Sequence, residues 1–165
     1  MTDSRQQLVD ALRDELQQYG EMLALLDRQQ ELVVERASDD LLQNVAAINA
    51  QTSVLQLARR VRGERQRELA GDLHLEDDAT FADLMGALPE AHAVLINALV
   101  NENNQCLRRV RQRVGQNHLL LTRSLDLMQR LLATLMAATQ TTLYQVDGKL
   151  TPTAAAGHPL CDTVG

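Results

Sequence analysis

The sequence predicts an all-α protein built from a long antiparallel helical hairpin and a long third helix. Leucine and alanine dominate an apolar content of 45%, whereas aromatic residues make up only 2% of the chain. β-branched residues never gather into the alternating runs that are typical of strands. Leucines instead recur every three or four residues, which is the spacing of one helix face. The 165-residue chain therefore fits a coiled-coil-like helical bundle better than a sheet fold.

The first helix is predicted from Ser4 to Arg36. At a rise of about 1.5 Å per residue it would be about 50 Å long. Its apolar positions form one continuous face, in which Gln29 and Gln30 fill one turn; they are Leu8, Leu12, Leu16, Tyr19, Leu23, Leu26 and Val33. A face kept up over this length predicts packing against a partner helix along its whole course.

The second helix is predicted to begin with Ser38 as its N-cap, because Asp39 and Asp40 then lie in the first turn. The short link before it makes the first two helices an antiparallel hairpin. Gly71 is a suitable end for the helix. Its apolar face is interrupted by Thr52 and Arg62 and consists of Leu41, Val45, Ile48, Leu55 and Leu69.

Residues 72–88 lack a sustained period, and they predict a loop with one short helix at residues 78–87. Pro89 suits the first turn of a third helix, which extends to about Leu143. Gly115 is the only glycine in this stretch, so the helix is either continuous or bent there. Residues 151–165 have loop composition and predict a flexible tail after a single helical domain of residues 1–150.

Asparagines mark the middle of the third helix. Asn103 falls near an apolar face made of Leu95, Leu99, Cys106 and Val110, where a buried amide would fix the helix register. Asn97, Asn101 and Asn104 share another face, which we interpret as a solvated polar surface.

The end of the third helix has an apolar face too wide for one partner helix. From Leu120 onward it covers about half of the circumference at about 100° per residue. Charged residues lie opposite, at Arg123, Asp126 and Arg130. The face is either the ordinary core of a bundle or oligomer, or a groove for an amphipathic client helix. Its residues are Leu120, Leu121, Leu125, Met128, Leu131, Leu132, Leu135 and Met136.

Catalytic and metal chemistry is not indicated. His74, His92, His118 and His158 lie in separate segments, and none has a second ligand at helical spacing. Cys106 and Cys161 suggest neither a metal site nor a disulfide framework. We expect no enzyme activity, no cofactor and no metal. A histidine phosphotransfer bundle using His118 is a weaker alternative, because "GQNHLLLTRS" lacks the lysine and glycine that follow such a histidine.

The formal charge of −6 disfavours nucleic-acid binding. Two arginine clusters, at residues 59–67 and 108–113, fit a solvated helix face that is partly paired with Glu64, Glu68 and neighbouring acids. The N-terminus lacks the apolar core of a signal peptide, and charges interrupt the most apolar stretch at residues 119–138. We therefore expect a cytoplasmic protein without membrane insertion.

Several segments, in order, resemble the FlgN family of flagellar export chaperones. "LALLDRQQELVVERASDDLLQNV" is similar to the family's helical hairpin, and "RRVRGERQREL" to the end of its second helix. "NENNQCLRRVRQRV" resembles its N-x-x-N-x-x-L segment through Asn101, Asn104 and Leu107. "TLYQVDGKL" resembles its Tyr-x-x-x-Gly-x-Leu ending through Tyr144, Gly148 and Leu150. The chain departs from the family at "AAINAQTS", where lysine is frequent, and at Gln145.

The resemblance implies a non-catalytic cytoplasmic chaperone that binds hook-associated flagellar proteins before their export. The terminal segments of these clients become amphipathic helices on assembly, and the apolar face from Leu120 to Met136 is the expected contact. The resemblance also implies that Tyr144 docks on the cytoplasmic domain of the export gate; a ring that caps the bundle end is the alternative. A self-associating, homo-oligomeric coiled-coil adaptor is the alternative function among binding proteins.

Overall fold

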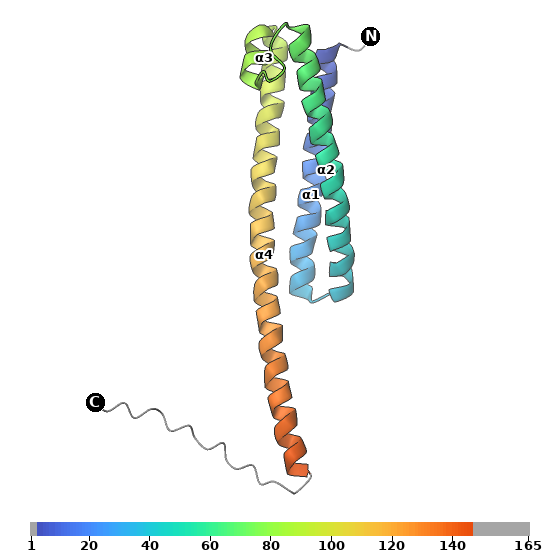
Figure 1. Cartoon of the computed structure of the whole chain (residues 1–165), viewed down its shortest axis with the longest axis vertical. Coiled ribbons are helices and arrows are strands. Elements are labelled where there is room, and N and C mark those ends of the chain that lie inside the picture. The colour runs from blue at the N-terminus through green and yellow to red at the C-terminus, as the bar shows by residue number, and fades with distance from the viewer. Residues whose placement is uncertain (1–2, 147–165) are drawn as a thin grey trace, which may run out of the picture. The chain divides into compact units, whose positions relative to one another are not determined.

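The computed structural model describes residues 3–146, with side-chain surroundings up to residue 138. The described residues form four helices: α1 (Ser4–Glu35), α2 (Ser38–Asp72), α3 (Phe81–Ala87) and α4 (Glu90–Val146) (Figure 1). These residues contain no strand. The predicted all-α fold, with a long hairpin and a long further helix, is confirmed. The expected tail at residues 151–165 lies outside the described residues.

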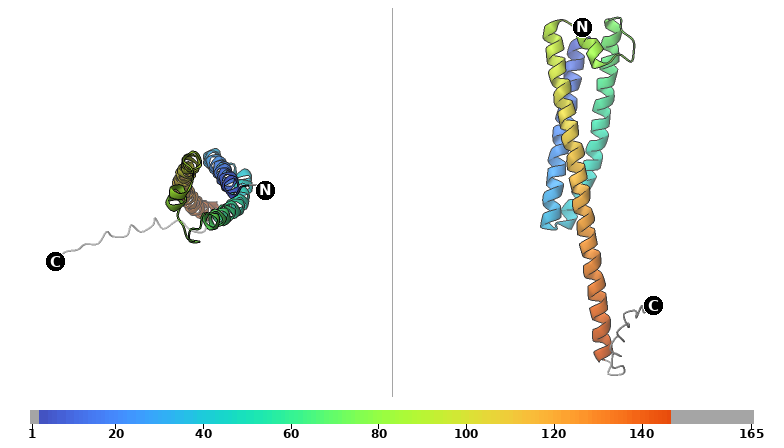
Figure 2. Two further views of the ribbon diagram at one scale, coloured as in Figure 1. Left: turned by 90° about the horizontal axis from the view of Figure 1, so that it is seen from above. Right: turned by 90° about the vertical axis from the view of Figure 1, so that its left-hand side faces the viewer.

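The chain divides into two units, residues 1–121 and residues 122–165, and α4 contributes to both. In the first unit, α1, α2 and the first part of α4 run side by side (Figure 2). The second unit contains the rest of α4. This helix is continuous through Gly115.

Arg36 reverses the chain between α1 and α2. It adopts a left-handed backbone at φ 57°, and the Ala37 N–H donates to the Leu32 carbonyl at 3.1 Å. The predicted N-cap Ser38 is wrong, because Ala37 occupies the cap position without a side-chain hydrogen bond and Ser38 is the first helical residue. The tight reversal at Arg36 provides hydrogen-bond donors for the last carbonyls of α1. It also starts α2 one residue earlier than an N-cap at Ser38 would.

The sequence predicted that Gly71 ends α2, but the structure differs. The helix continues to Asp72, and the left-handed residue is His74 at φ 58°. The Leu75 N–H then donates to the Ala70 carbonyl at 2.9 Å, so the usual glycine C-terminal motif is built around a histidine instead.

The short helix α3 starts three residues later than predicted, at Phe81, because Thr80 caps it. The Thr80 hydroxyl accepts from the Asp83 N–H, and the Asp83 carboxylate accepts from the Thr80 hydroxyl at 2.6 Å and from its N–H at 2.8 Å. These hydrogen bonds to the ionised carboxylate lower the pKa of Asp83. The capping box fixes where the loop ends.

One apolar core joins all the elements of the first unit. It combines the beginning of α1, the end of α2, α3 and the beginning of α4, and its buried members include Leu8, Leu12, Leu69, Leu84, Ile96 and Leu99. Pro89 precedes α4 directly, and its carbonyl accepts from the N–H groups of His92 and Ala93. The core therefore closes the bundle at the α3 end.

The buried faces differ from the predicted ones at several positions. On α4, Leu95 is exposed and Ile96 is fully buried in its place. On α2, Val45 is 38% exposed, whereas Asn44 and Gln51 are buried. Leu55 and Leu69 of the predicted α2 face are buried as expected, but apolar spacing missed the amide side chains that occupy part of the contact with α1.

Candidate partner-binding surfaces

An exposed apolar face lies on the part of α4 that belongs to the second unit. At about 100° per residue its members span an arc of about 140°. Their exposed fractions lie between 56% and 65%; they are Leu125, Met128, Leu131, Leu132, Leu135 and Met136. We call this set the α4 apolar face. Isolated exposed leucines are normal on a protein surface, but a continuous face of this kind marks an interaction site.

The structure places the other two predicted client-binding residues differently. Leu120 and Leu121 belong to the first unit and are half-buried. Tyr144, the predicted docking residue, lies within α4, and its side chain is outside the described residues. Helical spacing was therefore sufficient to find the α4 apolar face, but it could not separate the covered positions from the exposed ones.

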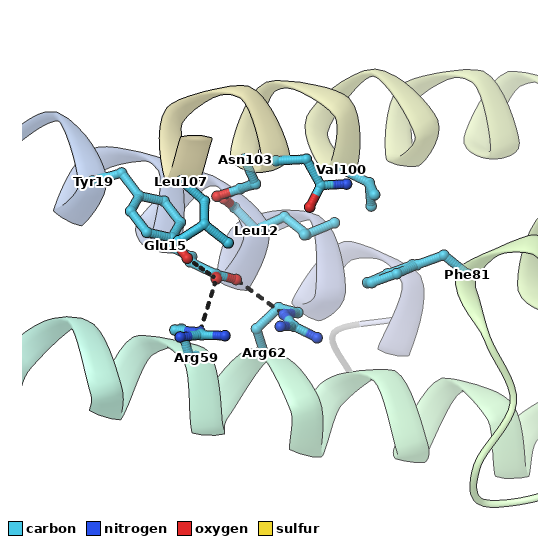
Figure 3. Close-up of a pocket in the computed structure, with 10 residues that line it drawn as sticks. Leu12, Glu15, Tyr19, Arg59, Arg62, Phe81, Val100, Asn103 and Leu107 are labelled. Carbon is cyan, nitrogen blue, oxygen red and sulfur yellow. Dashed lines mark hydrogen bonds and ion pairs between the residues drawn. The ribbon is translucent and has the colours of Figure 1, made fainter. Parts of the chain in front are cut away.

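A buried carboxylate lies at the centre of the first unit, in the side of α1 that faces α2. Only 3% of Glu15 is exposed. Its carboxylate accepts from Arg62 Nε at 2.9 Å and from the Tyr19 hydroxyl at 3.1 Å, and Arg59 Nε lies 3.8 Å away (Figure 3). Sequence analysis missed Glu15 because it takes an apolar position between Leu12 and Tyr19. A carboxylate on such a face, opposite arginines of the next helix, was the available signal.

Burial of the Tyr19 ring raises the pKa of its hydroxyl, and the neighbouring Glu15 carboxylate raises it further. Both effects disfavour the tyrosinate form, while Arg59 and Arg62 oppose them in part. The protonated hydroxyl is therefore the form that holds Glu15 in place.

A small pocket opens beside this network, between α2 and α4. Glu15 and Tyr19 of α1, Arg59 and Arg62 of α2, and Leu107 of α4 lie around it (Figure 3). Asn104 of α4 also lines it. Its volume is about 80 Å³. The other lining residues are Leu12, Phe81, Val100 and Asn103. The pocket thus combines apolar walls with two guanidinium groups.

Buried amides attach α2 and α4 to the backbone of α1. Asn103 Nδ2 donates to the carbonyls of Leu12 and Leu99, both at 3.0 Å. Asn117 Nδ2 donates to the Leu26 carbonyl at 2.8 Å. From α2, Asn44 and Gln51 donate to the carbonyls of Leu25 and Gln18. The predicted burial of Asn103 at the helix contact is confirmed, and Asn117 has the same arrangement.

The remaining asparagines and the arginines divide into solvated and paired groups. Asn97, Asn101 and Asn104 are exposed, as predicted. Arg60 pairs with Glu64 and Arg65 with Glu68, so part of the first arginine cluster is the paired helix face that we expected. Arg113 of the second cluster forms an ion pair with Asp27 of α1 at 2.7 Å. Arg108, Arg109 and Arg111 are exposed.

Among residues 3–146, no group of three or more His, Cys, Asp or Glu side chains is placed to hold a metal ion. No described helix is long and apolar enough to cross a membrane. His118 is exposed on α4.

Comparison with known families gives one result. The model of the FlgN family matches residues 1–152. The match includes the hairpin, α3 and the whole of α4. The chain belongs to the FlgN family.

Neither the curated proteins nor the solved structures contain a match to the chain. FlgN proteins are flagellar export chaperones, and this general role extends to the present member of the family. In this FlgN protein, the α4 apolar face is helical, apolar and exposed.

Proposed function

We propose that this FlgN protein is a cytoplasmic chaperone that binds hook-associated flagellar proteins through the α4 apolar face. Binding would cover the client's terminal amphipathic helix, prevent premature assembly and deliver the client to the export gate. The family assignment supports the general role. The client class follows from the family resemblance as a whole, and export-gate docking follows from Tyr144 in "TLYQVDGKL".

The α4 apolar face is the observation that carries this proposal. Its leucines and methionines are more than half exposed, although leucine is among the residues most often found inside proteins. Methionine side chains are flexible and adapt to irregular partner surfaces. A helix of this composition suits reversible packing against another amphipathic helix.

The charges on this part of α4 agree with that use. Arg123, Asp126 and Arg130 lie away from the α4 apolar face, at positions that do not flank it. Self-pairing coiled coils commonly carry charged residues beside their apolar positions, where they select a partner. Here Leu131 and Met136 form the two edges of the α4 apolar face, so the face is wider than the contact between two helices of a simple coiled coil.

The direct test is co-purification of hook-associated proteins with the full-length chain and its variants. We expect Leu131→Asp to abolish binding, because it places a charge in the middle of the α4 apolar face. The matched control is Ala133→Asp, which adds the same charge on an exposed position about 200° away around the helix. Equal binding by both variants and the wild type would disprove the assignment of this face.

Self-association through the same face is the alternative use, and oligomeric state distinguishes the two. If a homo-oligomer in the absence of client becomes a monomer in Leu131→Asp, and wild type binds no hook-associated protein, the chain is a self-associating adaptor. A wild-type chain that binds client, together with loss of that binding in Leu131→Asp, supports the chaperone.

Tyr144 is proposed as the contact with the export gate. We expect Tyr144→Ala to leave client binding unchanged while it weakens docking on the cytoplasmic domain of the gate. Tyr144→Phe separates the ring from the hydroxyl, because it retains the apolar ring. Loss of client binding in Tyr144→Ala would place this residue in the client surface instead.

A further inference from the structure

The walls on either side of the Glu15 pocket contain no acidic residue over long stretches. On α2, no Asp or Glu occurs between Asp40 and Glu64. On α4, none occurs between Glu102 and Asp126. The acidic residues that give the chain its net charge of −6 lie outside these two stretches. Both walls therefore have a positive local charge that the overall composition conceals.

The arginines of these walls retain the capacity to bind an anion. Glu15 is bonded to Arg62 at 2.9 Å, but Arg59 lies 3.8 Å from it, beyond a good hydrogen bond. The Arg59 side chain is 49% exposed. One buried carboxylate thus faces two guanidinium groups, and Arg59, the more distant of the two, is half-exposed and has further N–H donors.

The α4 wall continues this surface with mixed apolar and basic character. Steps of three and four residues lead along one face of the helix through Val100, Asn104, Leu107, Arg111 and Val114. Val100, Asn104 and Leu107 line the pocket. Arg111 is exposed, and Val114 is 48% exposed on a face whose other apolar members, Val100 and Leu107, are half-buried.

We propose that the surface between α2 and α4 over the Glu15 pocket is a docking site for an acidic amphipathic helix of a partner protein. Apolar side chains of that helix pack on Leu107 and Val114, and its carboxylates bind Arg59 and Arg111. This site uses only residues of the first unit. It is independent of the α4 apolar face and of the clients proposed for it.

The chemistry of the pocket favours a protein helix over a nucleic acid. Val100 and Leu107 present apolar surface that a phosphate backbone does not use. Phe81 of α3 lines the pocket, and the Arg62 guanidinium lies over its ring at 5.7 Å from the ring centre. A stacked base would need that ring face. The walls are themselves helices, and helices pack well against a further helix.

The test measures binding of two synthetic helical peptides to the full-length protein by fluorescence anisotropy. The peptides share one leucine face and differ only in flanking residues, glutamate in one and lysine in the other. We expect the glutamate peptide to bind and the lysine peptide to bind at least about tenfold more weakly, since complementary charge fixes partner choice. Equal affinity of both peptides would overturn the proposal.

Charge reversals locate the site. Arg59→Glu and Arg111→Glu should each weaken binding of the glutamate peptide by about tenfold, because attraction between the charges becomes repulsion at that position. The matched control is Arg109→Glu, which makes the same change about 200° around α4 and should alter affinity by less than about twofold. Equal losses in Arg109→Glu and Arg111→Glu would show a general charge effect and reject the site.

Competition with single-stranded RNA of matched charge examines the other class of partner. We expect RNA to displace the bound glutamate peptide only weakly, because it cannot fill the apolar part of the site. Val114→Asp tests the apolar part of the site, which the charge reversals do not test. It should also weaken binding of the glutamate peptide. Full displacement by RNA, together with no effect of Val114→Asp, would identify a polyanion site instead.

Discussion

Glu15 of α1 and Arg62 of α2 form a largely buried ion pair, with the carboxylate oxygen and the guanidinium Nε 2.9 Å apart. The Glu15 side chain is 4% exposed and that of Arg62 is 23% exposed. This pair lies within a hairpin that is otherwise held by leucines and amides. Removal of one partner therefore leaves a charge in a place where water has little access.

Glu15→Ala is expected to lower the free energy of unfolding by about 2 kcal/mol, less than the roughly 3–5 kcal/mol usual for a broken buried pair, because Arg62 retains some access to water. Urea denaturation followed by circular dichroism measures the loss. The double variant Glu15→Leu with Arg62→Met should recover most of it, since an apolar pair leaves no charge unpaired. A Glu15→Ala variant as stable as wild type would show that the pair contributes nothing to the fold.

Asn103→Ala and Asn117→Ala should each cost about 1 kcal/mol, because each removes donors from a carbonyl of α1. The two sites are fourteen residues apart on α4, about 21 Å at helical rise, so their effects should add. Urea denaturation of both single variants and the double variant checks this. Asn101→Ala, at an exposed position, is the control and should change little.

Tyr19 predicts a loss of stability at high pH. The folded chain raises the pKa of Tyr19, so the folded state holds this proton more tightly than the unfolded state. The stabilisation is complete below about pH 10, the ordinary pKa of tyrosine, and is lost as the pH rises through the higher folded value. Denaturation midpoints from pH 8 to 11, compared with Tyr19→Phe, measure this contribution. A wild-type curve that parallels that of Tyr19→Phe would contradict the prediction.

The core and the α4 apolar face should respond differently to the loss of side-chain volume. Ile96→Ala removes a fully buried side chain and should cost about 2–4 kcal/mol. Leu131→Ala, at a position 60% exposed, should stay within about 0.5 kcal/mol of wild type while it weakens client binding. Thermal melts of both variants give the comparison. A large loss of stability in Leu131→Ala would indicate that this leucine belongs to a core.

Much of the fold could be predicted from local patterns. Leucine spacing predicted the extent of α1 and the single long α4, because helical periodicity is a property of neighbouring residues. Asn103 could be placed at a helix contact for the same reason. The face of α2 was harder, since its contact with α1 includes Asn44 and Gln51, and amides at such positions cannot be told from exposed amides without the partner helix.

By itself, the sequence determined the all-α class, the hairpin, the apolar character of α4 and the membership of the FlgN family. Only the tertiary structure decided that Glu15 is buried, that it bonds Arg62 and Tyr19, and that Arg59 remains open beside it. It also decided which leucines are covered. Burial and ion pairing join residues that are far apart in the chain, here Glu15 and Arg62, and a pattern read along one segment contains no information about its neighbour in space.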